Sequence, residues 1–275
     1  MGMAFALALL DKRDRCTPKG HVLIRSLNTA ENAMLLEQNR IDALANNLAN
    51  VNTTGFKQIL TRVAEVMPQN PPGIATGPDS ANSPSPSRAP VLQMYHALDN
   101  RPGSVQATGR DIDVAIIGQG YFEVQTPNGT AYTRHGSFVL DAEQGLTTPD
   151  GLPIMGERGP VSLKGNEFSI ANDGAVMVDG KLTDRLKLVV FDDPSRLVHL
   201  GASLVVPPEG METRTLDATE AVVAQGHLEG SNVNPIRTLI AMIAAQRAFE
   251  VQSKVLTTED EMLAKSVNSL PRVGG

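Results

Sequence analysis

The chain has 275 residues, of which 20% are charged and 4% are aromatic, and it carries a formal net charge of -6 and no tryptophan. Nucleic-acid-binding domains usually show a basic patch and aromatic side chains that stack on bases, so this composition argues against nucleic acid as a partner. No apolar run reaches the roughly 20 residues of a membrane-spanning helix, which argues against direct membrane insertion. Cys16 is the single cysteine, so an internal disulfide and a multi-cysteine metal site are excluded.

Residues 1–21 are expected to stand apart from the folded protein. The opening MGMAFALALL is apolar like the core of a signal peptide. However, no positive charge precedes it, and DKRDRCTPKG follows where a small-residue cleavage site would lie. We therefore expect a misannotated or disordered extension rather than a cleaved signal peptide. The native start would then lie near Val22, and Cys16 would not belong to the working protein.

Residues 22–67 are expected to hold an N-terminal helix, from about residue 26 to residue 50, and the amide-rich turn that follows it. Ser26 is a candidate N-cap, and Gly55 is a candidate helix stop. Apolar residues recur at heptad spacing, which predicts a narrow seam for a partner helix. The seam positions are Leu27, Met34, Ile41 and Leu48, and Ala30, Leu44 and Val51 occupy offset positions.

A second helix is predicted near the C-terminus, within residues 226–275. Pro235 suits a first helical turn, Asn234 suits the cap before it, and Pro271 ends the pattern. The heptad positions are Met242, Phe249, Leu256, Leu263 and Leu270. One interpretation is an ordinary surface helix on a globular core. Two long seams at opposite ends of the chain instead favour helices that pair in a coiled coil.

Between the helices the sequence changes character. Residues 68–90 are rich in proline and serine and predict an extended or disordered linker. Residues 91–225 are expected to form a β-rich outer domain, with a hairpin at Asn128-Gly129, where apolar and polar residues alternate on both sides of the turn. The predicted class is α+β, with paired terminal helices forming a coiled-coil layer and a central antiparallel β domain.

The sequence contains little that would support catalysis. GQGYFE (residues 118–123) lacks the third glycine of a dinucleotide-binding loop, and strand-like sequence flanks it, so we interpret it as a turn or bulge. Asp111 and Asp113 lie two apart on a strand, and without a third ligand they are expected at a solvated edge. The five histidines show no helical pairing. We expect no enzyme activity, no cofactor and no metal site.

The stretch IDALANNLANVNTTGFK places four amides, Asn46, Asn47, Asn50 and Asn52, at the end of the first predicted helix. Asparagine is unfavourable inside helices and favourable at their ends, so capping is one explanation. A second explanation uses the ability of each amide to donate and accept hydrogen bonds. Repeated copies of one chain would then contact one another through their helix ends, without complementary charges.

Three segments together resemble one known family, the bacterial flagellar rod and hook proteins. LANNLANVNTTGFK (residues 44–57) resembles its N-terminal signature, and EGSNVNPIRTLIAMIAAQRAFEVQSKVLTTEDEML (residues 229–263) resembles its closing helix. TGRDIDVAIIGQGYFEVQTPNGTAYTRHGSFVLDAEQGLTTPDG resembles its shared β segment. The middle segment resembles the proximal rod branch, FlgF, whereas the opening and the ending are nearer the distal rod branch, FlgG. The middle segment is the more discriminating one, so the proximal branch is the expected assignment and the distal branch is the alternative.

The resemblance implies a structural subunit without enzyme activity. Such proteins leave the cytoplasm through the flagellar export apparatus, without a cleaved signal peptide. In the basal body they assemble with copies of themselves and with other rod and hook proteins into the hollow drive shaft of the periplasm. The residues expected to mediate subunit packing are Leu27, Met34, Ile41, Leu44, Asn46, Asn47, Leu48, Asn50, Asn52, Gly55, Phe56, Met242, Phe249, Leu256 and Leu263.

Two other classes of protein predict different features. A ligand-binding or enzymatic β domain with dimerising helices predicts a pocket of convergent polar groups in the β domain. A secreted adhesin-like protein predicts a functional signal peptide.

Overall fold

The computed structural model describes residues 19–66, 91–165, 167–201, 203–217, 220 and 222–268. Cys16, most of the expected N-terminal extension and the whole proline-rich linker lie outside the described residues. The chain divides into a β-rich unit, residues 42–242, and a helical unit made of the residues before and after this range. Each unit is described by itself below.

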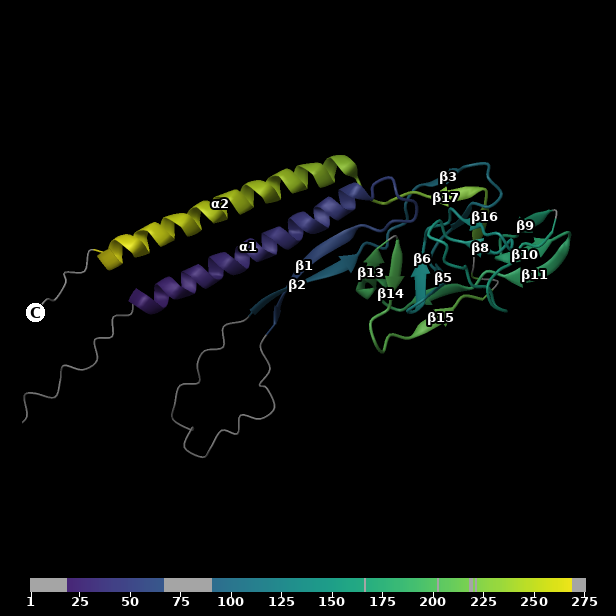
Figure 1. The fold of residues 1–275 in the computed structure, drawn as a ribbon, viewed down its shortest axis with the longest axis horizontal. Helices are drawn as coiled ribbons and strands as arrows, with labels where there is room; N and C mark the ends of the chain where they lie inside the picture. Colours follow the sequence, from purple (N-terminus) through teal and green to yellow (C-terminus); the bar gives the residue numbers. More distant parts are fainter. Residues whose placement is uncertain are drawn as a thin grey trace, which may run out of the picture. The chain divides into compact units, whose positions relative to one another are not determined.

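The described residues near the two ends of the chain form two helices, and Figure 1 labels both: α1 spans Lys19–Ala49 and α2 spans Pro235–Asn268. The expected start of the first helix was wrong, because Ser26 lies inside α1 rather than at its N-cap. The preceding residues include Leu23 and Ile24, which can continue a helix. The start of α2 is confirmed, since Asn234 Oδ1 accepts a hydrogen bond from the Arg237 N–H at 3.0 Å.

The β-rich unit contains an antiparallel six-stranded sheet with strand order β13-β14-β6-β5-β12-β15 (Figure 1). A three-stranded sheet has the order β11-β10-β9, and the other strands form antiparallel pairs. The prediction of an α+β protein with antiparallel strands is confirmed. The first strands are β1 (Ile59–Val66), β2 (Val91–Leu98), β3 (Val105–Ala107), β4 (Val114–Ile116), β5 (Tyr121–Thr126), β6 (Gly129–Thr133), β7 (Val139–Leu140) and β8 (Leu146–Thr147).

The remaining strands are β9 (Phe168–Ile170), β10 (Ala175–Val178), β11 (Lys181–Arg185), β12 (Leu188–Phe191), β13 (Val198–Gly201), β14 (Leu204–Val206), β15 (Thr213–Thr215), β16 (Val223–Gln225) and β17 (His227–Glu229). A 3-10 turn, η2, covers Pro194–Arg196.

Strand β5 faces a hydrophobic core on each side. Phe122 and Val124 belong to the larger core, where the Phe122 and Phe138 rings meet edge to face at 5.2 Å. Tyr121 belongs to a second core together with Phe191. Because successive side chains of a strand point to opposite faces, this alternation buries both faces of β5.

The predicted hairpin between β5 and β6 is present, with its turn one residue earlier than expected. Thr126 pairs with Gly129, so Pro127 and Asn128 form the turn and Gly129 already belongs to β6. Proline fixes its own φ at about −65°, which suits the first central position of a type I or type II turn.

Sequence reasoning missed the hairpin formed by β1 and β2. These strands pair from Ile59 with Leu98 to Val66 with Val91, across the proline-rich segment. The segment assigned to the N-terminal helix and turn therefore ends in a strand. More than twenty residues separate the end of β1 from the start of β2. A hairpin is recognised in a sequence by two strand-like runs joined by a short turn, and this pair lacks the short turn.

In the helical unit, the predicted seam residues Met34, Ile41, Phe249 and Leu256 are half-buried. Ile41 is the last residue of the N-terminal part of this unit. The side chains of Leu27 and Leu263 lie outside the described part of the structure, and Leu270 lies outside the described residues altogether. Leu44, Leu48 and Met242, which belong to the β-rich unit, are also half-buried.

Candidate functional site

Glu229, the last residue of β17, is the centre of a buried ionic cluster. Its side chain is 2% exposed, with Lys57 Nζ 2.7 Å from Oε1 and Arg134 Nη1 2.9 Å from Oε2. The Gly103 N–H also donates to Oε1, at 2.9 Å. Both carboxylate oxygens are thus satisfied by cations or amides, as a buried charge requires.

The pKa values of the cluster follow from burial and mutual charge. Burial alone raises the pKa of Glu229, but the charges of Arg134 and Lys57, with hydrogen bonds from Lys57 and the Gly103 N–H, outweigh it and hold the pKa below its ordinary value. For Lys57, burial and the charge of Arg134 lower the pKa, and the attraction of Glu229 only partly opposes them. The negative charge of Glu229 therefore stabilises the two buried cations, Lys57 and Arg134.

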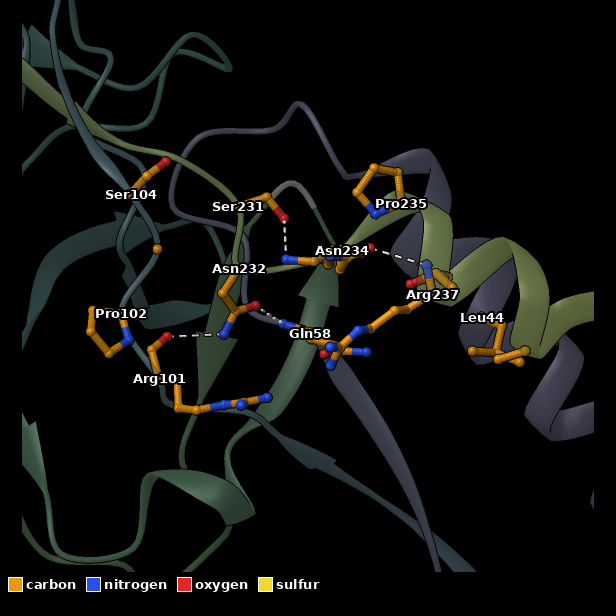
Figure 2. Close-up of a pocket in the computed structure, with 14 residues that line it drawn as sticks. Leu44, Gln58, Arg101, Pro102, Ser104, Ser231, Asn232, Asn234, Pro235 and Arg237 are labelled. Atoms are coloured by element: carbon orange, nitrogen blue, oxygen red, sulfur yellow. Dashed lines mark hydrogen bonds between the residues drawn. The ribbon is translucent and has the colours of Figure 1, made fainter.

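Asn232 connects three chain segments through its amide, as Figure 2 shows. Its Oδ1 accepts from the Gln58 N–H at 2.7 Å. Its Nδ2 donates to the backbone oxygens of Asp99 at 2.8 Å and Arg101 at 2.9 Å. One side chain thus connects the segment before α2 to the residue that precedes β1 and to the segment that follows β2.

Asn47 does the same for the end of α1. Its side chain is 0% exposed, its Nδ2 donates to the Ile59 oxygen at 2.8 Å, and its Oδ1 accepts from the Ile59 N–H at 2.7 Å. The amide therefore pairs with the backbone of β1 as a neighbouring strand would. We call Asn47, Lys57, Arg134, Glu229 and Asn232 the polar junction.

The turn after α1 fits against the junction with little room. The Gly55 N–H donates to the backbone oxygen of Glu229 at 2.7 Å, and Gly55 has a φ of +68°. A Cβ atom on Gly55 would lie 2.3 Å from the carbonyl of Arg134. Phe56 is 1% exposed, and its ring meets His199 edge to face at 5.5 Å.

A groove of about 600 Å³ lies beside the junction (Figure 2). Its walls come from the end of α1 at Leu44, the loop from Arg101 to Ser104, and the start of α2 at Pro235 and Arg237. Among the described residues that line it there is no aspartate, glutamate, histidine or cysteine. The groove therefore offers no side chain suited to general acid–base catalysis.

The predicted amides are not equivalent in the structure. Asn46 and Asn52 are exposed, whereas Asn50 is half-buried. The Nδ2 of Asn50 donates to the backbone oxygen of Asn46 at 2.9 Å. The role expected for Asn47 needs correction: a fully buried side chain whose amide is already paired has no surface to offer another copy.

Asp113 is a second correction. It was expected at a solvated edge, but it is 1% exposed, and Arg110 Nη1 lies 3.6 Å from its Oδ1. Asp111 is exposed, as expected. Within the described ranges, no three His, Cys, Asp or Glu side chains gather closely enough to hold a metal ion.

Sequence reasoning did not identify Lys57, Arg134, Glu229 or Asn232 as a group. Lys57 and Glu229 are 172 residues apart, and Arg134 is 95 residues from Glu229. A lysine and a glutamate in these positions look like ordinary surface charges until the fold buries them. The glycines around them were the available signal, since Gly55 and Gly103 both mark close backbone approaches.

Replacing Asn47 by alanine is expected to lower the free energy of unfolding by about 1–3 kcal/mol, because the Ile59 N–H and C=O each lose their partner. The matched control is Asn52→Ala, at an exposed position, which should change it by no more than about 0.5 kcal/mol. Urea unfolding followed by circular dichroism measures both. Equal effects would show that the buried amide has no special importance.

Three family models match the chain. They are the flagella basal body rod protein model at residues 27–57, the flagellar hook protein FlgE/F/G D1 domain at residues 115–178, and the flagellar basal body rod FlgEFG protein C-terminal model at residues 224–270. Lys57, Arg134 and Glu229 fall one in each matched range, so the ionic cluster joins the three regions.

Similar proteins extend over nearly the whole chain. The flagellar basal-body rod protein FlgG of Bacillus subtilis is 33% identical over 267 residues, covering 90% of this chain and 99% of the relative. FlgG of Borreliella burgdorferi is 33% identical, covering 90% and 98%. The rod protein FlgF of Caulobacter vibrioides is 31% identical, covering 85% and 92%.

None of the described helices combines the length and the apolar character needed to cross a membrane. The family models and the extent of the similarity agree with the resemblance drawn from the three sequence segments. The chain belongs to the family of flagellar basal-body rod proteins.

Proposed function

We propose that this chain is a structural subunit of the flagellar basal-body rod, the hollow shaft that transmits torque across the periplasm. The polar junction carries the proposal. It fastens the end of α1, through Asn47, and the segment leading into α2, through Glu229 and Asn232, to one β-rich unit. A subunit that transmits force needs such stiff connections more than it needs a ligand site.

The terminal helices would form the inner, coiled-coil layer of this shaft. Their seam residues support the pairing, because Met34, Phe249 and Leu256 are apolar and half-buried at heptad spacing. Asn46 and Asn52 remain candidates for contacts between copies, since both side chains are exposed near the end of α1.

The chain is expected to act without enzyme activity or cofactor. Its partners would be copies of itself, other rod and hook proteins, and the flagellar export apparatus through which it leaves the cytoplasm. Export would not involve a cleaved signal peptide. A ligand-binding β domain with dimerising helices is less well supported, because the groove beside the junction lacks convergent titratable groups.

The position along the rod is a finer question. The middle segment favours the proximal branch, whereas the FlgG relatives named above are covered to 98–99% of their length, against 92% for the FlgF relative. This fuller coverage favours a distal position. Electron microscopy of basal bodies from a deletion strain would separate the two, because loss of a proximal subunit should remove all later rod structure.

The first test is location. A C-terminally tagged chain should be recovered in purified basal bodies of normal cells and be absent from those of a strain without the flagellar export gate. Mass spectrometry of the same sample would identify the N-terminus of the exported chain. A chain found free in the cytoplasm irrespective of export, or one with a processed leader, would overturn the proposal.

A further inference from the structure

The helical unit contains a groove between its two helices, with a volume of about 470 Å³. Four apolar side chains line it: Met34 and Leu35 from α1, and Phe249 and Leu256 from α2. Three of them are predicted seam residues, and Leu35 is 56% exposed. The two helices of one copy therefore leave part of their apolar seam uncovered.

The same helix α2 carries a second apolar surface. Val251 is 64% exposed, Val255 is 48% exposed and Met262 is 60% exposed. At about 100° per residue, positions four and eleven apart lie within about 40° of each other, so the three side chains form one stripe. We call Val251, Val255 and Met262 the outer stripe.

The outer stripe cannot reach the groove of its own copy. Val251 follows Phe249 by two residues, which turns it about 200° around the helix and nearly to the opposite side. A surface helix normally has one apolar stripe and a polar face opposite it. Here both sides are apolar, and the second lacks a cover in the described part of the helical unit.

Charge distinguishes the two surfaces in a complementary way. The groove has acidic side chains at its rim, Glu31 and Asp260. Three exposed cations, Arg247, Lys254 and Lys265, lie one helical turn from members of the outer stripe, and the half-buried Glu259 is the one acid at such a spacing, so cations predominate along it. Apolar surface can thus meet apolar surface while opposite charges approach along one side.

We infer that the groove between α1 and α2 of one copy receives the outer stripe of α2 from a second copy of this chain. Each copy then offers a stripe at one side and a groove at another, and such an interface repeats along an array instead of closing into a dimer. The inference rests on the proposed function and names the surfaces by which the helical layer would grow.

Disulfide formation tests the contact in the full-length chain. All variants carry Cys16→Ser, and two differently tagged copies carry Leu35→Cys in the groove and Val255→Cys in the outer stripe. A disulfide requires Cα atoms within about 7 Å, so a doubly tagged, linked dimer should form on oxidation. Thr257→Cys is the matched control, since this exposed position lies about 200° from Val255 and should give no linked dimer.

A polar substitution provides the second measurement. Val251→Asp in the copy with Val255→Cys should abolish linking, whereas Thr257→Asp should leave it unchanged. The inference is overturned if Thr257→Cys links as well as Val255→Cys, if Val255→Cys links only to itself, or if Val251→Asp has no effect.

The same reactions on purified, concentrated chain separate the inference from the proposed function. Linking in this sample, combined with absence of the unmodified chain from basal bodies, would refute the rod assignment and retain the contact. Recovery of the chain in basal bodies without linking in either sample would refute the contact alone.

Discussion

Replacing Glu229 by glutamine is expected to lower the free energy of unfolding by about 3–5 kcal/mol, because it leaves the buried Lys57 and Arg134 cations without their counter-charge. Guanidinium unfolding of the full chain measures the loss. The matched control is Glu220→Gln, in an ion pair with Arg214 whose side chains are 46% and 59% exposed. Exposed pairs contribute no more than about 1 kcal/mol, so the control should unfold nearly as the parent does.

The pH dependence of this difference identifies the charge as its cause. The pKa of Glu229 is lowered in the folded state, so its contribution is complete above the unfolded pKa of about 4.3 and is lost as pH falls through the folded value. The gap in stability between the parent and Glu229→Gln should therefore be constant near neutral pH and shrink below about pH 4.3. A gap that persists at lower pH would point to lost packing instead.

Replacing Gly55 by alanine is expected to cause the second large loss. Gly55 has a φ of +68°, which costs a non-glycine residue about 1–2 kcal/mol. The new Cβ would also meet the Arg134 carbonyl at 2.3 Å, and overpacking of this kind typically adds about 1–3 kcal/mol. Movement of the turn away from Arg134 would in addition weaken the hydrogen bond from the Gly55 N–H to the backbone oxygen of Glu229.

Gly109 provides a matched control for Gly55→Ala. Its φ is +72°, but a Cβ there would meet nothing within 4 Å. Gly109→Ala therefore isolates the cost of the left-handed backbone, and the excess loss in Gly55→Ala isolates the close approach. Thermal or denaturant unfolding of both variants gives the comparison, and equal losses would mean that the turn relaxes freely away from Arg134.

Local patterns predicted the parts of the fold that depend on neighbouring residues. The start of α2 follows from Asn234 and Pro235, and the hairpin of β5 and β6 follows from alternation around Asn128. The start of α1 and the partner of β1 were not predicted, because the first lacks a unique capping signal and the second depends on pairing across the proline-rich segment.

The residues of the polar junction also differ in whether neighbouring residues or distant ones determine their contacts. Asn47 stood out as an amide, but its spacing could not distinguish a buried bond to Ile59 from an exposed contact with another copy. Glu229 became visible only when folding placed it beside Lys57 and Arg134. The outer stripe of α2 was missed because heptad counting finds one seam per helix and does not search the opposite side.

The ionic cluster cannot be completed until the chain has been extended as far as Glu229. Lys57 and Glu229 are separated by 172 residues, so the pair closes a loop that contains most of the β-rich unit. A chain truncated before Glu229 would bring Lys57 and Arg134 together without an anion, and their mutual repulsion would oppose consolidation. The last sixth of the polypeptide, which begins at Glu229, therefore supplies the charge that a partial subunit would lack, and the polar junction would stay incomplete without it.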